Sequence, residues 1–68
     1  MQISRWKIEL AQAQAGMSAT QLSEASGISR QHISTIKTRG TCMPITAAKL
    51  ARGLGVPLES ILEDRKDV

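Results

Sequence analysis

A chain of 68 residues with a single aromatic residue, Trp6, can build one small domain with a modest core. Its formal net charge of +3 favours an anionic partner. A lone cysteine, Cys42, excludes an internal disulfide. Nothing in the sequence resembles a signal peptide or a membrane-spanning run, which predicts a cytoplasmic protein.

Helix-forming residues dominate the chain and no segment alternates as a strand does, so the sequence predicts an all-α domain of five helices. The first helix is expected over residues 4–15, and Gly16 is expected to end it. Its apolar residues form two stripes on nearly opposite faces, and a helix of this kind is either packed on two sides or meets a partner. The first stripe comprises Ile8, Ala11 and Ala15, and the second comprises Ile3, Trp6, Leu10 and Ala13.

Two further helices are expected to meet at a sharp turn. Ser18 is the predicted N-cap of the second helix, with Gln21 at the capping-box position, and the helix is expected to end at residues 26–27. Gly27 can supply the positive-φ turn, and Ser29 is the predicted N-cap of a third helix that ends at residue 37 or 38. This order of elements is typical of a helix-turn-helix, whose second helix can lie in the DNA major groove.

The C-terminal third predicts two shorter helices and a tail. Thr46 is expected to cap a fourth helix that ends at Leu54, with Gly55 as its stop. Pro57 suits the first turn of a fifth helix over residues 58–62. Residues 1–68 are therefore expected to form a single domain with a core of about 4–62, and the charged segment 63–68 is expected to fray.

The charges are distributed unevenly along the chain. No Asp or Glu occurs between Ala25 and Leu58. Five basic residues lie in that stretch, namely Arg30, Lys37, Arg39, Lys49 and Arg52. A basic middle suits a phosphate backbone, although a solvated surface that happens to be basic has the same composition.

With these elements placed, the chain resembles the Cro/cI-type (XRE-type) helix-turn-helix family over about residues 4–62. The matching motifs are, in chain order, Gly16-Met17-Ser18, Gln21-Leu22-Ser23, Gly27-Ile28-Ser29-Arg30, Ile33-Ser34-x-Ile36 and Leu50-Ala51-x-x-Leu54-Gly55-Val56-Pro57-Leu58. The resemblance implies a compact five-helix domain like the DNA-binding domain of lambda repressor. Its third helix would then be the recognition helix.

The chain departs from this family at three places. The family often pairs an Arg in the first helix with a Glu that ends the third, but Gln12 and Lys37 stand there, so the ion pair is absent. Ser26 occupies a position that is usually apolar. The loop glycine, Gly40, falls one place late.

Helical projection of the third helix turns Ile33 and Ile36 inward and leaves a polar outer face. Glutamine can bridge two groups of adenine, arginine can bridge two groups of guanine, and threonine offers a methyl group and a hydroxyl. The family's base-reading positions agree with this projection. The residues predicted to read bases are Arg30, Gln31, Ser34 and Thr35.

Phosphate contacts are expected at the start of the second and third helices and around the loop after the third helix. The predicted residues are Ser18, Ser29, Lys37, Thr38, Arg39 and Thr41. Lys49 and Arg52 are ambiguous. His32 either reaches DNA or is an ordinary surface histidine, and because it has no partner at metal-ligand spacing, no metal is expected. Cys42 is expected to be a loop thiol without a role.

These features predict a transcription regulator, foremost a repressor of phage or mobile-element type that binds a pseudo-palindromic operator in double-stranded DNA as a homodimer. An antitoxin that binds a partner toxin and represses its own promoter is one alternative, and a protein-interaction module without a DNA role is another. No enzyme activity or cofactor is expected, because paired carboxylates, a Ser-His-Asp set and a phosphate loop are all missing. The dimer contact is assigned either to Leu58, Ile61 and Leu62 or to the stripe of Ile3, Trp6 and Leu10, unless these residues are buried within one subunit.

Overall fold

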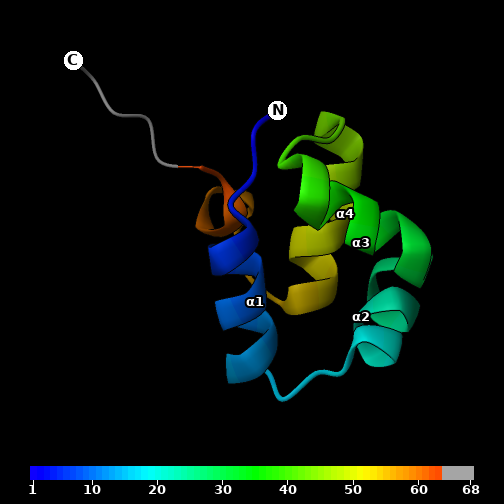
Figure 1. Cartoon of the computed structure of the whole chain (residues 1–68). Coiled ribbons are helices and arrows are strands. Elements are labelled where there is room, and N and C mark those ends of the chain that lie inside the picture. Colours follow the sequence, from blue (N-terminus) through cyan, green and yellow to red (C-terminus); the bar gives the residue numbers. More distant parts are fainter. Residues whose placement is uncertain (64–68) are drawn as a thin grey trace.

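The computed structural model describes residues 1–63 and contains four α-helices and a short 3-10 helix (Figure 1). The elements are α1 (Arg5–Gln14), α2 (Ala19–Ser26), α3 (Arg30–Arg39), α4 (Pro44–Leu54) and η1 (Leu58–Ile61). The all-helical class is confirmed for this part of the chain. The prediction of five α-helices is wrong, because the last element is one 3-10 turn that stops where Leu62 becomes extended and pairs with Ile3. The predicted fraying of the tail concerns residues that lie, apart from residue 63, outside those described.

The helix-turn-helix forms as its capping residues predict. The side chain of Ser18 accepts the N–H of Gln21, and the Gln21 side chain accepts the N–H of Ser18, which completes the capping box. Gly27 ends α2 at φ 75°. The Ser29 side chain caps α3 by accepting a hydrogen bond from the backbone N–H of His32. The helix α3 continues one residue beyond the expected end, where Gly40 stops it in the left-handed conformation.

The predicted start of α4 is wrong. The helix begins at Pro44, and Met43 is its N-cap without a capping side chain, so Thr46 lies inside the first turn. Proline suits this place because it lacks the N–H that would find no partner there and its φ is already helical. The expected inner face of α4 is confirmed, and its members Ala47, Leu50, Ala51 and Leu54 are buried.

The core is one cluster of buried apolar side chains to which α1, α2, α3, α4 and η1 all contribute. A polar residue, Ser26, is buried at the end of α2, where its hydroxyl donates to the Ser23 carbonyl and accepts the Ile28 N–H. The departure from the usual apolar residue is therefore satisfied within the turn. Gly53 of α4 lies directly against Ser26, so the two helices cross with almost no side chain between them.

The second predicted stripe of the first helix, with Ile3, Trp6 and Leu10, does not form one surface. Ile3 precedes α1 and is buried, whereas Trp6 is 70% exposed and Leu10 is 44% exposed. The alternative in which Trp6 is buried within one subunit is therefore wrong. Trp6 and Leu10 form a small apolar patch on the outer side of α1, which we call the α1 patch.

Residues 1–4 run in an extended conformation between two segments that are distant in sequence. On one edge the Ile3 N–H donates to the Gly40 carbonyl (2.9 Å) and the Cys42 N–H donates to the Met1 carbonyl (3.1 Å). On the other edge the Ser4 N–H donates to the Ile61 carbonyl over 2.8 Å. This pairing joins the loop after α3 to the C-terminal end of the described chain.

Candidate nucleic-acid interface

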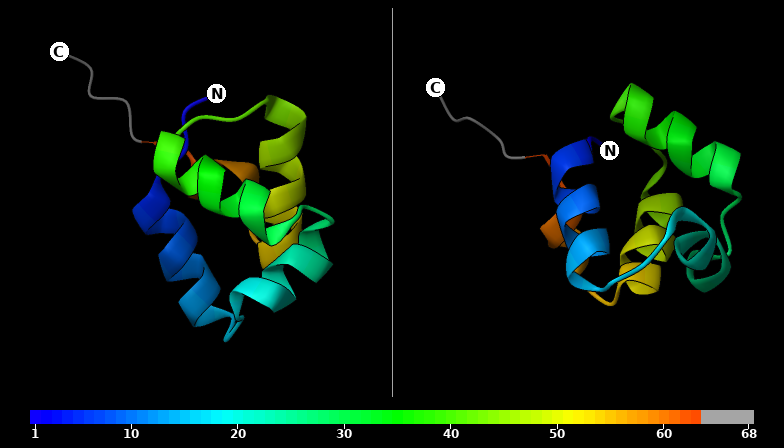
Figure 2. Two further views of the ribbon diagram at one scale, coloured as in Figure 1. Left: turned by 45° about the vertical axis from the view of Figure 1, so that its right-hand side comes forward. Right: turned by 60° about the horizontal axis from the view of Figure 1, so that its bottom comes forward.

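The helix α3 lies on the outside of the bundle, between α1 and the start of α4 (Figure 2). Ile33 and Ile36 are 4% and 2% exposed and anchor it to the core. Its outer face is polar, as the projection predicts. The exposed residues Gln31, Ser34, Thr35 and Thr38 form a ridge along it, which we call the α3 ridge.

The residues predicted to read bases differ in how much hydrogen-bonding capacity they keep. Thr35 donates its hydroxyl to the Gln31 carbonyl (3.0 Å), so it offers a methyl group and an acceptor to a ligand. The Gln31 side-chain amide makes no hydrogen bond within the described part of the chain and keeps its donors and acceptor. Arg30 is exposed at the first position of α3. These groups match the edges that bases present in a major groove.

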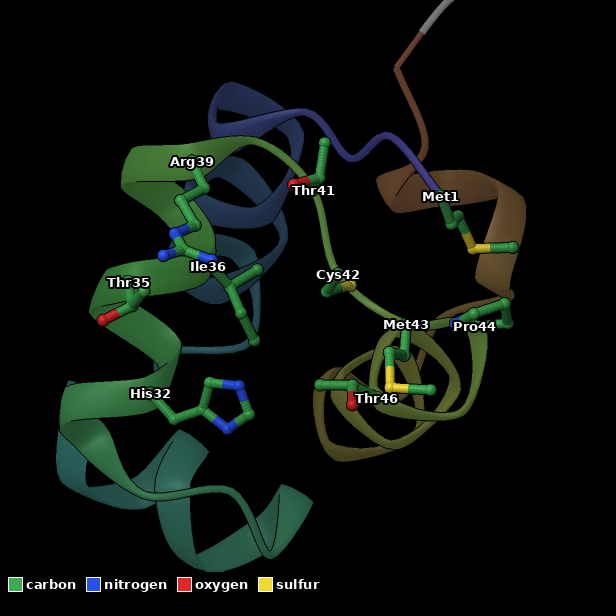
Figure 3. A pocket seen from close by; sticks show the side chains of 10 residues that line it. All are labelled: Met1, His32, Thr35, Ile36, Arg39, Thr41, Cys42, Met43, Pro44 and Thr46. Carbon is green, nitrogen blue, oxygen red and sulfur yellow. The ribbon is translucent and has the colours of Figure 1, made fainter.

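Two open grooves flank the α3 ridge. The first, the α4 groove, lies between α3 and the loop that leads into α4 (Figure 3). His32, Thr35 and Arg39 line its α3 side, and the His32 ring points toward Thr46 at the start of α4. The second, the α1 groove, lies on the other flank, between α3 and α1. An α-helix with grooves on both sides can enter the major groove of DNA, because the two grooves leave room for the phosphate backbones at its edges.

The start of α2 opens toward the α1 groove, which Ala19 helps to line. The capping box uses the N–H groups of Ser18 and Gln21. The N–H groups of Ala19 and Thr20 have no carbonyl partner within the helix, as in any first helical turn. An anion at this end would therefore meet two free donors and the positive end of the helix dipole.

Lys37 has an internal partner that the sequence did not reveal. Its ammonium donates to the Gln12 side-chain oxygen over 3.1 Å and joins α3 to α1 where the family often has an ion pair. A hydrogen bond thus stands where an ion pair is usual in the family. An ammonium has three donors, so Lys37 can hold Gln12 and still contact a phosphate. The nearby residues Thr38, Arg39 and Thr41 are exposed.

Cys42 is half-buried in the loop between α3 and α4. Burial raises the pKa of the Cys42 thiol above its ordinary value, which lowers the fraction of reactive thiolate. Residues 1–63 contain no group of His, Cys, Asp and Glu side chains that could hold a metal ion. None of the helices in that range is both long enough and apolar enough to cross a membrane.

A helix-turn-helix with a polar outer helix and basic flanks defines the class of DNA-binding domains that place one helix in the major groove. Residues 8–61 match the helix-turn-helix family, and the chain belongs to it, with the Cro/cI-type (XRE-type) members. No curated protein and no solved structure matches the chain significantly.

Proposed function

We propose that this member of a DNA-binding regulator family is a repressor of phage or mobile-element type that acts in the cytoplasm on a pseudo-palindromic operator. The observation that carries the proposal is the α3 ridge, which is polar, exposed and flanked by cations. A helix is about 10–12 Å across and the major groove is about 12 Å wide, so the ridge can reach base edges. The base-reading residues are then Arg30, Gln31, Ser34 and Thr35.

The phosphate contacts follow from the two flanks of α3. Lys37 and the caps Ser18 and Ser29 lie toward one strand of the duplex, with the free amides at the start of α2. Thr38, Arg39 and Thr41 lie toward the other strand. These contacts give affinity for any DNA, and the base-reading residues add the preference for one sequence.

Arg39→Gln and Lys37→Gln are each expected to weaken binding to operator and random duplexes alike. The slope of log K against log salt should become shallower by about 0.9 for each lost phosphate contact, because fewer counterions are released. Fluorescence anisotropy over a salt series measures this slope. Lys49→Gln removes an exposed charge of α4 outside both grooves and should leave the slope unchanged. An unchanged slope in Arg39→Gln would remove Arg39 from the interface, and loss of operator binding alone would assign it to base reading.

Binding-site selection from random DNA tests the proposed function directly. One recognition helix contacts only a few base pairs, and two copies with helices about 34 Å apart read two half-sites on one face of the duplex. We therefore expect an inverted repeat with that spacing. Selection without enrichment would favour the protein-interaction module instead, and a single half-site with one protein per duplex would exclude the dimer.

We place the dimer contact at the η1 end, through Leu58 and Leu62, which are half-buried and pack against the core. Ile61 is fully buried and cannot take part directly. A contact built on these two half-buried side chains would bury little surface, so we expect a dimer that is weak in free protein and forms on DNA.

Trp6 reports on the alternative contact. It is exposed in the single subunit, so a dimer through η1 should leave its fluorescence emission unchanged when the protein is diluted. Sedimentation followed on the same samples gives the fraction of dimer. A red shift of the emission that tracks dissociation would move the dimer contact to the α1 patch.

The antitoxin alternative is favoured by one observation, the α1 patch itself. Tryptophan is enriched among the residues that dominate protein interfaces, and Trp6 lies on the face of α1 that turns away from the core. A toxin-like protein that copurifies with the wild-type chain and is lost from Trp6→Ala would support this alternative.

A further inference from the structure

The α1 groove contains an ion pair that belongs to neither the recognition helix nor the turn. Arg5 and Glu9 of α1 line it together with Ala19 of α2 and Arg30, Ser34 and Lys37 of α3. The Nε atom of Arg5 lies 3.4 Å from Oε1 of Glu9. Both side chains are solvent-accessible, with 65% of Arg5 and 41% of Glu9 exposed, so the pair can open without exposing a buried charge.

The charge of this groove is uneven. Three cations line it, Arg5, Arg30 and Lys37, and Glu9 is the carboxylate among them. The α4 groove on the opposite flank of α3 is lined by Arg39 and His32 and by no carboxylate of the described chain. Glu9 is therefore the one described carboxylate that borders either flank of the α3 ridge.

Resting on the proposed function, we propose that the α1 groove receives one phosphodiester strand and that Arg5 exchanges Glu9 for a phosphate of that strand. The Glu9 carboxylate then remains beside the strand, and its negative charge weakens binding to every duplex. When α3 fills the major groove, the strands on its two edges run along the two flanks of the helix. The α1 groove is the flank where Arg30 and Lys37 already lie, and Ala19 marks the open start of α2 there.

The exchange is favourable for a physical reason. An exposed ion pair contributes little because water screens it and both side chains lose freedom. A phosphate contact releases a condensed counterion from DNA, and the salt solution gains entropy. The ion pair thus keeps Arg5 near the site, and little free energy is lost when Arg5 leaves Glu9 for a phosphate. Glu9 repels the same phosphate strand, and this repulsion is the same for operator and random DNA.

The test compares Glu9→Gln and Arg5→Gln with wild type on the selected operator and on a random duplex of equal length, over a salt series. Glu9→Gln should bind both duplexes about threefold more tightly, which is the Coulomb effect in water of removing one like charge if a phosphate binds about 6 Å from it. The ratio of the two affinities should stay the same. Arg5→Gln should bind both more weakly and lose about 0.9 from the salt slope. Thermal unfolding of both variants checks that the fold is retained.

Glu24→Gln is the matched control, because Glu24 is an exposed carboxylate of α2 that lines neither groove and its loss changes the net charge equally. Equal gains of affinity in Glu24→Gln and Glu9→Gln would overturn the proposed role of Glu9, since the change in net charge alone would explain them. A loss of affinity in Glu9→Gln would also overturn it and would show that Glu9 orients Arg5. An unchanged salt slope in Arg5→Gln would remove Arg5 from the interface. These results overturn this proposal alone, whereas a wild-type chain that binds no duplex overturns the proposed function as well.

Discussion

Gly53→Ala is expected to destabilise the domain by about 1–3 kcal/mol, the usual cost of adding a methyl group to a packed interior. A Cβ on Gly53 would lie 2.8 Å from the Cβ of Ser26 and 2.9 Å from its Cα and N. The last two are backbone atoms that cannot rotate away, and Ser26 is fixed by its hydrogen bonds in the turn. Either α2 or α4 must therefore move.

The loss should appear although alanine favours helix by about 0.8–1.0 kcal/mol over glycine. Chemical or thermal unfolding measures it, and a domain of this size loses about 4–8 °C of Tm for each kcal/mol. Ala48→Gly, at an exposed position of the same helix, measures the helix-propensity effect without the contact. A Gly53→Ala variant as stable as wild type would show that the α2–α4 crossing can open at little cost.

The crossing also holds the helix-turn-helix to the rest of the domain. The turn that positions α3 begins at Ser26, so a displaced α2 would carry the recognition helix with it. We expect Gly53→Ala to weaken operator binding at temperatures where the domain is still folded. Binding that falls only when unfolding begins would limit the role of Gly53 to stability.

Gln31→Ala is expected to lower operator affinity by about 1–3 kcal/mol and to relax the preference at one or two base pairs. The Gln31 side chain is exposed on the α3 ridge, so its removal should leave the stability of the domain nearly unchanged. Binding-site selection repeated with the variant identifies the base pairs that Gln31 reads. Arg30→Ala should relax different base pairs, because Arg30 is the first residue of α3.

Random DNA separates this effect from a loss of general affinity. Gln31→Ala should bind a random duplex as wild type does and with the same salt slope, since glutamine releases no counterion. Gln14→Ala, which removes an exposed glutamine at the end of α1, is the matched control and should keep the full preference. A Gln31→Ala variant that keeps it would remove Gln31 from the base-reading set.

The sequence by itself determined the helix-turn-helix and the α3 ridge. Ser18 and Ser29 cap their helices through groups three residues away, and Gly27 takes the turn that other residues adopt only with strain. The inward direction of Ile33 and Ile36 follows from helical periodicity alone. Each of these features depends on interactions within one turn of helix, so the order of residues suffices to predict them. The start of α4 also depends on local interactions, and Pro44 indicates it better than Thr46 does.

Tertiary structure decided what involves partners far apart in the chain. The pairing of residues 1–4 with residues 40–42 and 61–63 ended η1 after one turn and drew Ile3 away from the apolar stripe. The bond from Lys37 to Gln12 spans 25 residues. Because α1 carries two apolar stripes, its sequence does not determine which face is buried. Packing buries the face with Ile8 and leaves Trp6 exposed. The α1 groove, which brings Arg5 and Glu9 beside the recognition helix, depends on how α1 packs. The sequence determines which residues share one face of a helix, and packing determines which element that face contacts.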